Sequence, residues 1–286
     1  METTIRREAE PLRDAVGAAL ALDGVPETLL WTLHNRAQEA MRPDALLRDP
    51  DAVRLYRSID YDYARSFGTP DGSHALRSHM FDEALRPWLA AHPGGTVVEL
   101  ACGLETQFQR CDDGAVRWLC VEVPETIAVR ERFLPASERC RHLAKSALDL
   151  SWLDEVDASR GVFITAQGLL MYFEEAQVHA LLAAIDARLP GAQLMFDTIP
   201  RWFSRKTVAG FYKTPQYRAP PMPWGISHRR IVPTLHRWMP HAEHIEIVPY
   251  GFYRGVAGRL LPLFSRLPGL RNLLPSIVRV RLKGQA

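Results

Sequence analysis

The middle of the chain alternates between short apolar runs and longer segments in which apolar and polar residues mix. The apolar runs are rich in β-branched residues and predict strands at 96–101, 117–122, 140–143, 162–166 and 192–198. The mixed segments predict helices at 124–134 and 174–188. Strands that alternate with helices form a parallel sheet covered on both faces, so the predicted fold class is α/β.

Two longer helical patterns come before the first predicted strand. Residues 27–41 and 72–91 carry apolar side chains at helical spacing, and a His-Pro-Gly-Gly sequence ends the second pattern. Two more apolar segments, near 244–249 and 276–283, predict further strands. We therefore expect N-terminal helices before the sheet and additional strands near the C-terminus.

Residues 200–240 interrupt the alternation. They contain seven prolines, and aromatic residues such as Trp202, Phe203 and Trp224 stand among them. Insertions of this kind often shape small-molecule pockets in α/β folds, so we favour a lid over the site. The alternative is an irregular packed segment that contacts no ligand.

The segment TVVELACGLET at residues 96–106 runs from a predicted strand directly into a glycine turn. Gly103 has no Cβ, so the backbone can turn tightly there and approach a ligand. The next predicted strand ends on Glu122, about 20 residues later, the spacing at which an acid meets the two ribose hydroxyls of a nucleoside. The alternative is an ordinary strand, turn and helix without a ligand.

The residues of the turn also favour one kind of nucleoside. Dinucleotide folds use several glycines to hold a pyrophosphate on a helix N-terminus, whereas Gly103 stands alone here. Glu99 and Glu105 flank the turn, and their negative charge disfavours a pyrophosphate. The methionine portion of S-adenosylmethionine is zwitterionic and tolerates both acids. We therefore infer S-adenosylmethionine as the cofactor, with an NAD-dependent oxidoreductase as the rival interpretation.

Five sequence blocks between Val97 and Pro200 carry a more specific signal. They are VVELACGLETQFQR, WLCVEVPETIAVRERFLP, AKSALDLSW, FITAQGLLMYF and LMFDTIP, in this order. In these blocks the chain resembles the leucine carboxyl methyltransferase family, especially its bacterial branch of tetracenomycin-type polyketide O-methyltransferases. The resemblance implies a Rossmann-like class I methyltransferase with a seven-stranded, mostly parallel sheet and a reversed last strand.

From the patterns along the chain we expect four parts. Residues 1–92 form an N-terminal helical segment that covers the site, and residues 93–200 form the S-adenosylmethionine-binding core. Residues 201–243 form the insertion, rich in proline and aromatic residues, that serves as lid and substrate segment. Residues 244–286 complete the sheet with strands that pair as a reversed hairpin at its edge.

The resemblance further implies which residues form the site. Arg77 pairs with the cofactor's carboxylate, and Asp149 lies near its adenine amino group. The other cofactor-binding residues are Glu99, Ala101, Gly103, Glu122, Val123, Ser146, Ala147, Leu148, Gln167 and Gly168. Tyr172 faces the acceptor and Arg36 lies near the pocket, which makes these two the catalytic candidates. The residues alone leave other interpretations open: a turn cap for Asp149, a solvated helix residue for Arg77 and a core aromatic for Tyr172.

Two positions depart from the family's pattern. Most relatives carry a glutamate where this chain has Gln167, and a glycine is common where it has Ala101. An amide keeps donor and acceptor capacity but loses the charge. The methyl group of Ala101 is expected to narrow the turn slightly. A binding protein that has kept the fold and lost turnover is therefore an alternative function.

The chemistry of the donor limits what the site must supply. A sulfonium methyl is already activated, so the attacking oxygen needs in-line placement about 3 Å away and a pocket that excludes water. A carboxylate needs no general base at neutral pH, whereas a phenol, an alcohol or a carbon nucleophile does. No histidine pairs with an acid at catalytic spacing, which favours a carboxylate of an aromatic or polyketide-like molecule. A phenol, amine or carbon acceptor is the alternative.

The charge of the chain is unevenly placed. Residues 201–286 hold 15 lysines and arginines and two acidic residues, whereas the first 200 residues hold 20 and 31. A basic face suits an acidic acceptor or an acidic carrier protein, and the alternative is that the acidic half of the fold balances it. No helix-turn-helix pattern or RNA-stacking motif supports a nucleic-acid partner.

The sequence also predicts the compartment. No apolar run approaches the roughly 20 residues of a membrane span, and the N-terminal METTIRREAEPLRD is charged. The four cysteines show no metal-binding spacing and are expected to be buried thiols in a reducing environment. We therefore expect a cytoplasmic protein without a transmembrane segment or a metal site.

Overall fold

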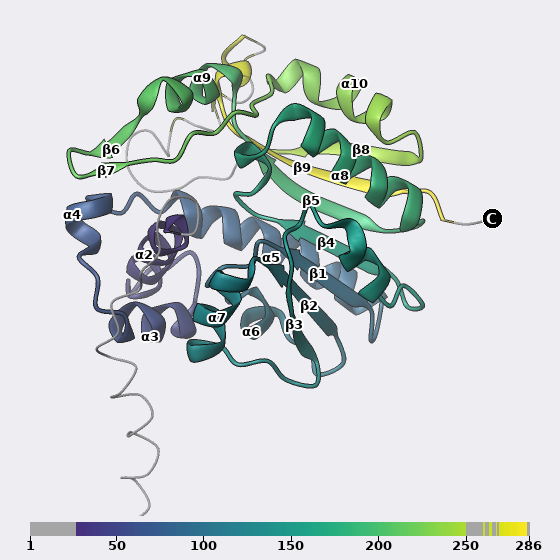
Figure 1. Cartoon of the computed structure of the whole chain (residues 1–286), viewed down its shortest axis with the longest axis horizontal. Helices are drawn as coiled ribbons and strands as arrows, with labels where there is room; N and C mark the ends of the chain where they lie inside the picture. The colour runs from purple at the N-terminus through teal and green to yellow at the C-terminus, as the bar shows by residue number, and fades with distance from the viewer. Residues whose placement is uncertain (1–26, 250–259, 261–262, 265–266, 268, 285–286) are drawn as a thin grey trace, which may run out of the picture.

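The computed structural model describes residues 27–249, 260, 263–264, 267 and 269–284, and a sheet with helices on both faces forms its centre (Figure 1). The seven strands of this sheet are β1 Thr96–Leu100, β2 Arg117–Glu122, β3 Cys140–Ala144, β4 Val162–Ala166, β5 Gln193–Thr198, β8 Ala242–Val248 and β9 Ser276–Leu282. A separate pair of short strands, β6 Tyr212–Thr214 and β7 Tyr217–Arg218, lies outside it.

Helices precede, connect and follow these strands. The α-helices are α2 Thr28–Ala40, α3 Pro50–Ser58, α4 Tyr63–Phe67, α5 Ser73–Ala91, α6 Gln107–Cys111, α7 Pro124–Phe133, α8 Glu175–Arg188, α9 Arg201–Gly210 and α10 His228–Trp238. The 3₁₀ helices are η1 Leu150–Glu155, η2 Leu170–Tyr172 and η3 Leu270–Leu273. Local chemistry fixes where some of them begin. The carboxylate of Asp49 accepts from Ala52 N at the start of α3, and Glu174 and Gln177 form a capping box at the start of α8.

The strand order in the sheet is β3-β2-β1-β4-β5-β9-β8. Strands β1 to β5 are parallel, whereas β9 pairs antiparallel with both β5 and β8. The predicted mostly parallel sheet with a reversed last strand is therefore confirmed. The predicted pairing of the last two strands also forms. The antiparallel strand β9 lies next to β5, and β8 forms the edge of the sheet.

The central strands of the sheet are buried on both faces, which explains why β1 and β4 are apolar nearly throughout. Val97 and Trp118 pack with Phe81 and Trp88 on the face covered by α5. The next residue of β1, Val98, belongs to the core on the opposite face, which α8 and α10 cover. Adjacent residues of one strand point to opposite faces, so a strand buried on both sides shows no polar alternation.

The N-terminal helices α2, α3 and α4 form a third apolar cluster of their own. Leu30, Leu55 and Phe67 pack together in it, and Tyr217 of β7 joins them. The side chain of Thr214 in β6 donates to the carbonyl oxygen of Ser66 in α4, at 2.9 Å. The outer strand pair therefore rests on the N-terminal helices, which lie far from it in sequence (Figure 1).

The proline-rich insertion consists of two unlike parts. Helix α10 covers the sheet, because Ile231, Leu235 and Trp238 belong to the large core on the α8 face. Helix α9 and the pair β6–β7 lie instead away from α10, above α2 and α4 (Figure 1). The pattern of prolines and aromatic residues did not distinguish these parts, since both contain them.

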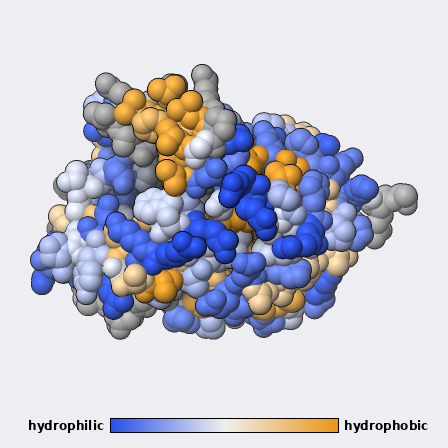
Figure 2. Space-filling model, turned by 90° about the horizontal axis from the view of Figure 1, so that it is seen from above, coloured by the Kyte–Doolittle hydropathy of each residue, from blue (hydrophilic) through white to orange (hydrophobic). Residues whose placement is uncertain are grey.

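Apolar side chains gather on the face shown in Figure 2, beside a broad hydrophilic area. The large apolar side chains that are exposed near the C-terminal end of the described chain are Leu260, Leu263, Phe264, Leu267, Leu270 and Leu273. Trp202 of α9 is also 48% exposed, and its ring nitrogen donates to Leu273 O at 2.9 Å. This patch therefore joins α9 to the segment before β9.

None of the helices in the described ranges combines the length and the apolar character that crossing a membrane requires.

Candidate active site

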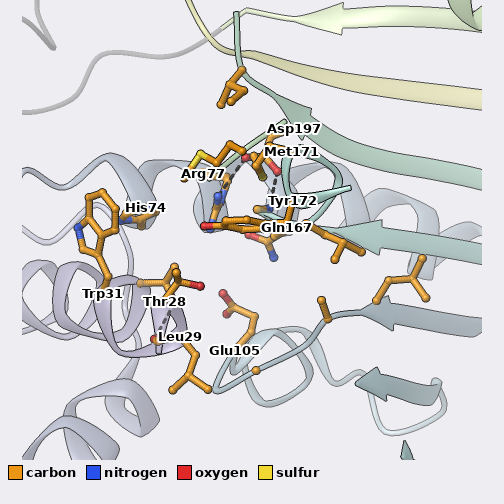
Figure 3. Close-up of a pocket in the computed structure, with 18 of the residues that line it drawn as sticks. Thr28, Leu29, Trp31, His74, Arg77, Glu105, Gln167, Met171, Tyr172 and Asp197 are labelled. Atoms are coloured by element: carbon orange, nitrogen blue, oxygen red, sulfur yellow. Dashed lines mark hydrogen bonds and ion pairs between the residues drawn. The ribbon is translucent and has the colours of Figure 1, made fainter. Parts of the chain in front are cut away.

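A cavity of about 930 Å³ lies where β1, β2, β4 and β5 end (Figure 3). Residues from the starts of α2 and α5 line one side of it, and residues from η2, α9 and the segment before β9 line another. Parallel sheets bind ligands beyond the carboxyl ends of their strands. The position and size of this cavity therefore make it the candidate site.

The turn after β1 is left-handed at two residues. Ala101 has φ 54° and Gly103 has φ 45°. A Cβ on Gly103 would lie 3.2 Å from Cβ of Leu29, so the position is crowded as well as left-handed. Ala101 is the only non-glycine residue with positive φ in the described chain, a conformation that costs an alanine about 1–2 kcal/mol. Its methyl group therefore adds backbone strain at this turn.

The structure brings Gly103 and Glu122 together. Oε2 of Glu122 accepts from Gly103 N at 3.0 Å, and Oε1 accepts from Val123 N at 2.8 Å. Burial raises the pKa of Glu122, and the two backbone N–H bonds oppose that shift. A carboxylate has about four acceptor positions, so two remain for hydroxyl groups in the cavity.

Two buried arginines hold the turn from the side away from the cavity. Arg130 of α7 donates to Gly103 O at 2.9 Å and to Glu105 O at 2.8 Å. Arg36 of α2 donates to Leu104 O at 2.7 Å and forms an ion pair with Glu105 at the same distance. Arg36 is fully buried and does not line the cavity, so it positions the turn. Its predicted catalytic role stays a prediction.

The two glutamates that flank the turn differ in their ionisation state. Burial raises the pKa of Glu99 far above its ordinary value, and its Oε2 accepts from the ring nitrogen of Trp118 at 2.9 Å. Burial would raise the pKa of Glu105 too, but Arg36 and Arg110 outweigh it and lower that pKa to about 2. Only Glu105 therefore carries the negative charge that the sequence suggested for both.

Arg77 of α5 meets the end of β5. Its guanidinium forms an ion pair with Asp197 at 3.0 Å, and the other oxygen of Asp197 accepts from Gly168 N at 2.6 Å (Figure 3). Gly168 has φ 64°, and a Cβ there would lie 2.9 Å from the guanidinium of Arg77. Asp197 thus joins β5, the β4 loop and α5, and all three residues line the cavity.

Further polar side chains face the cavity from η2, α5 and the end of β4. Gln167 Oε1 accepts from the hydroxyl of Ser78 at 3.3 Å, while its amide nitrogen is buried without a partner. Burial raises the pKa of Tyr172 to about 12, so its hydroxyl is protonated at neutral pH. Burial and the nearby Arg77 lower the pKa of His74 to about 3, so its imidazole is neutral.

The loop after β3 divides the residues predicted there. Ser146 and Ala147 line the cavity, whereas Leu148 and Asp149 are not among its lining residues. Asp149 is exposed, and its carboxylate accepts from the backbone and hydroxyl of Ser151 at 3.1 and 2.7 Å. That is the turn cap which the sequence left open for Asp149. Its contact with adenine stays a prediction.

The opposite side of the cavity is mainly apolar. Its lining includes Leu29, Trp31, Met171, Ile199, Pro200, Trp202, Phe203, Met222, Phe264, Leu273, Leu274 and Pro275. Several of them are also exposed at the surface, so the apolar lining continues to the patch in Figure 2. A hydrophobic molecule that enters from this patch therefore stays in contact with apolar side chains until it reaches the cavity.

Sequence reasoning missed His74, Asp197 and Arg130 as parts of the site. Asp197 carried a usable signal, because it is an acid at the end of a predicted strand. His74 and Arg130 carried none, since their importance comes from contacts with elements far along the chain.

The buried cysteines and the neighbouring His142 lie close together. Ligand atoms of Cys120, Cys140 and His142 lie within 4.8 Å of one another. However, Arg130 donates to Nε2 of His142 at 3.3 Å and is fully buried in the same place. A permanent cation opposes a bound metal ion, so this cluster does not favour a metal site.

Comparison with known proteins agrees with this geometry. The chain matches the leucine carboxyl methyltransferase family over residues 30–186. It belongs to this family. Membership confirms the resemblance found in the five sequence blocks, and with it the assignment of the chain as an S-adenosylmethionine-dependent methyltransferase.

Individual members are moderately similar. The chain is 34% identical over 218 residues to the tetracenomycin polyketide synthesis O-methyltransferase TcmP of Streptomyces glaucescens, covering 75% of this chain and 80% of that protein. It is 30% identical to the S-adenosyl-L-methionine-dependent methyltransferase dpfgK of Gibberella zeae, covering 58% and 62%. Among solved structures, the N-methyltransferase NodS from Bradyrhizobium japonicum WM9 is similar at 14% identity and a TM-score of 0.46, covering 74% and 98%.

Proposed function

We propose that this protein transfers the methyl group of S-adenosylmethionine to an oxygen of a small aromatic or polyketide-like molecule. A carboxylate is the acceptor group that we favour. The observation that carries the proposal is the cavity, which joins the polar ends of β1, β2 and β4 to a mainly apolar side. The similarity to the polyketide O-methyltransferase of Streptomyces glaucescens supports the class of acceptor.

The residues fit this cofactor on observations of the cavity alone. Glu122 has acceptor positions left for two ribose hydroxyls, and the turn at Gly103 has no side chain between backbone and cavity. The volume of about 930 Å³ lies near the upper end of the roughly 300–1,000 Å³ of ligand pockets. It therefore leaves room for a second molecule beside the cofactor.

The bound cofactor supplies an electrophilic methyl group, and the protein supplies placement. Phe203, Met222 and Trp31 provide apolar surface on which a flat acceptor can pack. The protonated hydroxyl of Tyr172 can donate to an acceptor oxygen and orient it. Closure of the cavity around both molecules excludes water, and we propose that residues 201–226 act as the lid.

The first test is binding and product formation. Calorimetry should detect S-adenosylhomocysteine, and methyl-labelled S-adenosylmethionine should label aromatic acids. No binding of S-adenosylhomocysteine at millimolar concentration would remove the cofactor from the proposal. Binding without labelled product from any acceptor would instead favour a binding protein that has lost turnover.

A second candidate, methylation of a hydroxyl such as a phenol, is favoured by the charge of the cavity. Within its described lining, Arg77 is the one basic side chain that stays charged, and Asp197 is already paired with it. An anionic acceptor therefore meets little positive charge apart from the sulfonium. A phenol is uncharged before it reacts and needs no such positive charge, but His74, with its pKa of about 3, is too weak a base to take its proton.

The two acceptor groups give products that are easily separated. A methyl ester releases labelled methanol in mild alkali, whereas an aryl methyl ether keeps its label. Label released by alkali supports the carboxylate, and label retained supports the hydroxyl.

The cationic face suggests how an acceptor is delivered. In the described part of the chain, exposed basic residues of the 201–238 segment without an ion pair are Arg201, Arg205, Lys206, Arg218, Arg229, Arg230 and Arg237. We propose that an acidic carrier protein is the partner. We also propose that the protein acts in the cytoplasm. A carrier-bound acceptor should then react faster than the free one, and the advantage should shrink as salt rises.

A further inference from the structure

The carboxylate of Glu105 points into the cavity from the turn after β1 (Figure 3). Its Oε1 accepts from Arg36 and Arg110, both at 2.7 Å, and from Thr106 N at 2.9 Å. Its Oε2 accepts only from the hydroxyl of Ser78, at 3.0 Å, among the bonds of the described residues. One oxygen is thus fully used by the protein, and the other faces ligand space.

Glu105 belongs to a cluster of buried charges. Arg36 and Arg110 are paired with three carboxylates, those of Asp49, Asp82 and Glu105. A third buried arginine, Arg130, donates to Glu105 O at 2.8 Å, so the buried positive and negative charges are equal in number. The cluster therefore keeps Glu105 ionised.

Glu105 is the member of this cluster that can meet a ligand. The side chains of Arg36, Arg110, Asp49 and Asp82 are at most 4% exposed, and none of them lines the cavity. Glu105 lines it and is 11% exposed. A cation in the cavity beside Glu105 would be attracted to its carboxylate at short range.

The neighbours of Glu105 indicate a cation that donates hydrogen bonds. The hydroxyl of Ser78 lies 3.0 Å from Glu105 Oε2 and 3.3 Å from Gln167 Oε1. A hydroxyl has a single hydrogen, so one of the two oxygens is always open to another donor. An ammonium group carries three donors and can satisfy both oxygens. The unpartnered amide nitrogen of Gln167 in turn needs an acceptor. A carboxylate group next to the ammonium group of the same ligand provides one.

We infer that Glu105 is the anionic partner of the α-ammonium group of the cofactor's methionine portion, with Gln167 Oε1 as a second acceptor. The negative charge at this end of the site then comes from the turn after β1 and not from the end of β4. Arg36 and Arg110 are positioning residues, since they hold the carboxylate ionised and aimed at the cavity. The inference rests on the proposed function, because it takes S-adenosylmethionine as the occupant.

The test compares two ligands by calorimetry. One is S-adenosylhomocysteine, and the other is its deaminated analogue, in which hydrogen replaces the ammonium group. The wild-type protein should bind the analogue about 10- to 150-fold more weakly, as expected for hydrogen bonds to charged groups. In Glu105→Gln this ratio should fall below about threefold, because a neutral amide gains little from an ammonium.

Asp49→Asn is the matched control. It removes one carboxylate from the same two arginines, while the cavity keeps its lining. The ratio between the two ligands should stay close to that of the wild type. A ratio that falls equally in Asp49→Asn and Glu105→Gln would overturn the inference, because the buried cluster and not the contact would then set it.

Glu105→Asp keeps the charge that the arginines need, and it serves if Glu105→Gln does not fold. The shorter side chain withdraws the carboxylate from the cavity, so the ratio should fall at least about fivefold. A wild-type ratio in either folded variant contradicts the inference, as does a wild-type protein that binds both ligands equally. A wild-type protein that binds neither ligand contradicts the proposed function instead.

Discussion

The two sides of the cavity are built in different ways. The side formed by the strand ends holds its polar groups through short, specific bonds, as in the pair of backbone N–H groups that bind Glu122. The opposite side consists of apolar side chains from α2, η2, α9 and the segment before β9, with few polar bonds among them. The first side is suited to one fixed ligand, and the second to molecules that vary in shape.

This difference predicts which substitutions affect which ligand. Changes on the strand-end side should reduce affinity for the cofactor and spare the apolar side. Changes on the apolar side should alter the use of the acceptor and spare the cofactor. If both kinds of change affect both ligands alike, the division is wrong.

The largest effect is expected from Gly103→Val. The substitution places a branched side chain at φ 45°, with its Cβ 3.2 Å from Leu29. Left-handed strain and overpacking together should cost about 2–5 kcal/mol, and binding of S-adenosylhomocysteine should be lost. Calorimetry and urea denaturation measure the two effects. Gly114→Val is the control, since Gly114 has φ 82° but no atom within 4 Å of a built Cβ. It should lose stability and keep its affinity.

The next largest effect is expected from Glu122→Ala. The variant loses two charge-assisted hydrogen bonds to ribose hydroxyls, and affinity for S-adenosylhomocysteine should fall by about 3 kcal/mol. Calorimetry measures the change. Glu122→Gln should lose less, because its amide can still accept one bond. An affinity that stays at the wild-type value in Glu122→Ala would mean that the acid points elsewhere.

Acid should destabilise the protein through His74 and Glu105. The folded-state pKa values, about 3 and about 2, lie below the ordinary values of 6.5 and 4.5. The unfolded chain therefore binds protons first as pH falls, and stability should drop below pH 6.5, by up to about 1.4 kcal/mol per pH unit for each group. His74→Asn should flatten the fall between pH 6.5 and 5 in urea denaturation curves. An equal slope in that variant would show that His74 does not titrate in this way.

The smallest effect is expected on the apolar side. Phe203→Ala removes a ring that lines the cavity beside Tyr172 and Met222. The KM for the acceptor should rise about 5- to 30-fold, which corresponds to about 1–2 kcal/mol of lost binding free energy. Affinity for S-adenosylhomocysteine should change less than twofold. Phe211→Ala is the matched control, because Phe211 packs edge-to-face against Phe203 without lining the cavity. A loss of cofactor affinity in Phe203→Ala would break the division between the two sides.

The sequence predicted the strand-end side better than the apolar side, for a physical reason. Gly103 and Glu122 belong to a strand, a turn and the next strand, so their proximity follows from local geometry. The predicted strands from β1 to β5 agree with the structure for the same reason, since all are short local runs and β1 and β4 are buried on both faces.

What escaped the sequence depends on long-range contacts. The ionised state of Glu105 and the neutral state of Glu99 differ because Arg36 and Arg110 outweigh burial at Glu105, whereas burial dominates at Glu99. No local pattern contains that information. Likewise, α9 and α10 both carry aromatic residues within one proline-rich segment, but only their packing shows that α10 covers the sheet.

A crystal structure of the protein with S-adenosylhomocysteine tests the central claim most directly. The account predicts both ribose hydroxyls on the carboxylate of Glu122, and the sulfur atom turned toward Tyr172 and Phe203. A nucleoside bound elsewhere, or one in this cavity with its ribose away from Glu122, would contradict it.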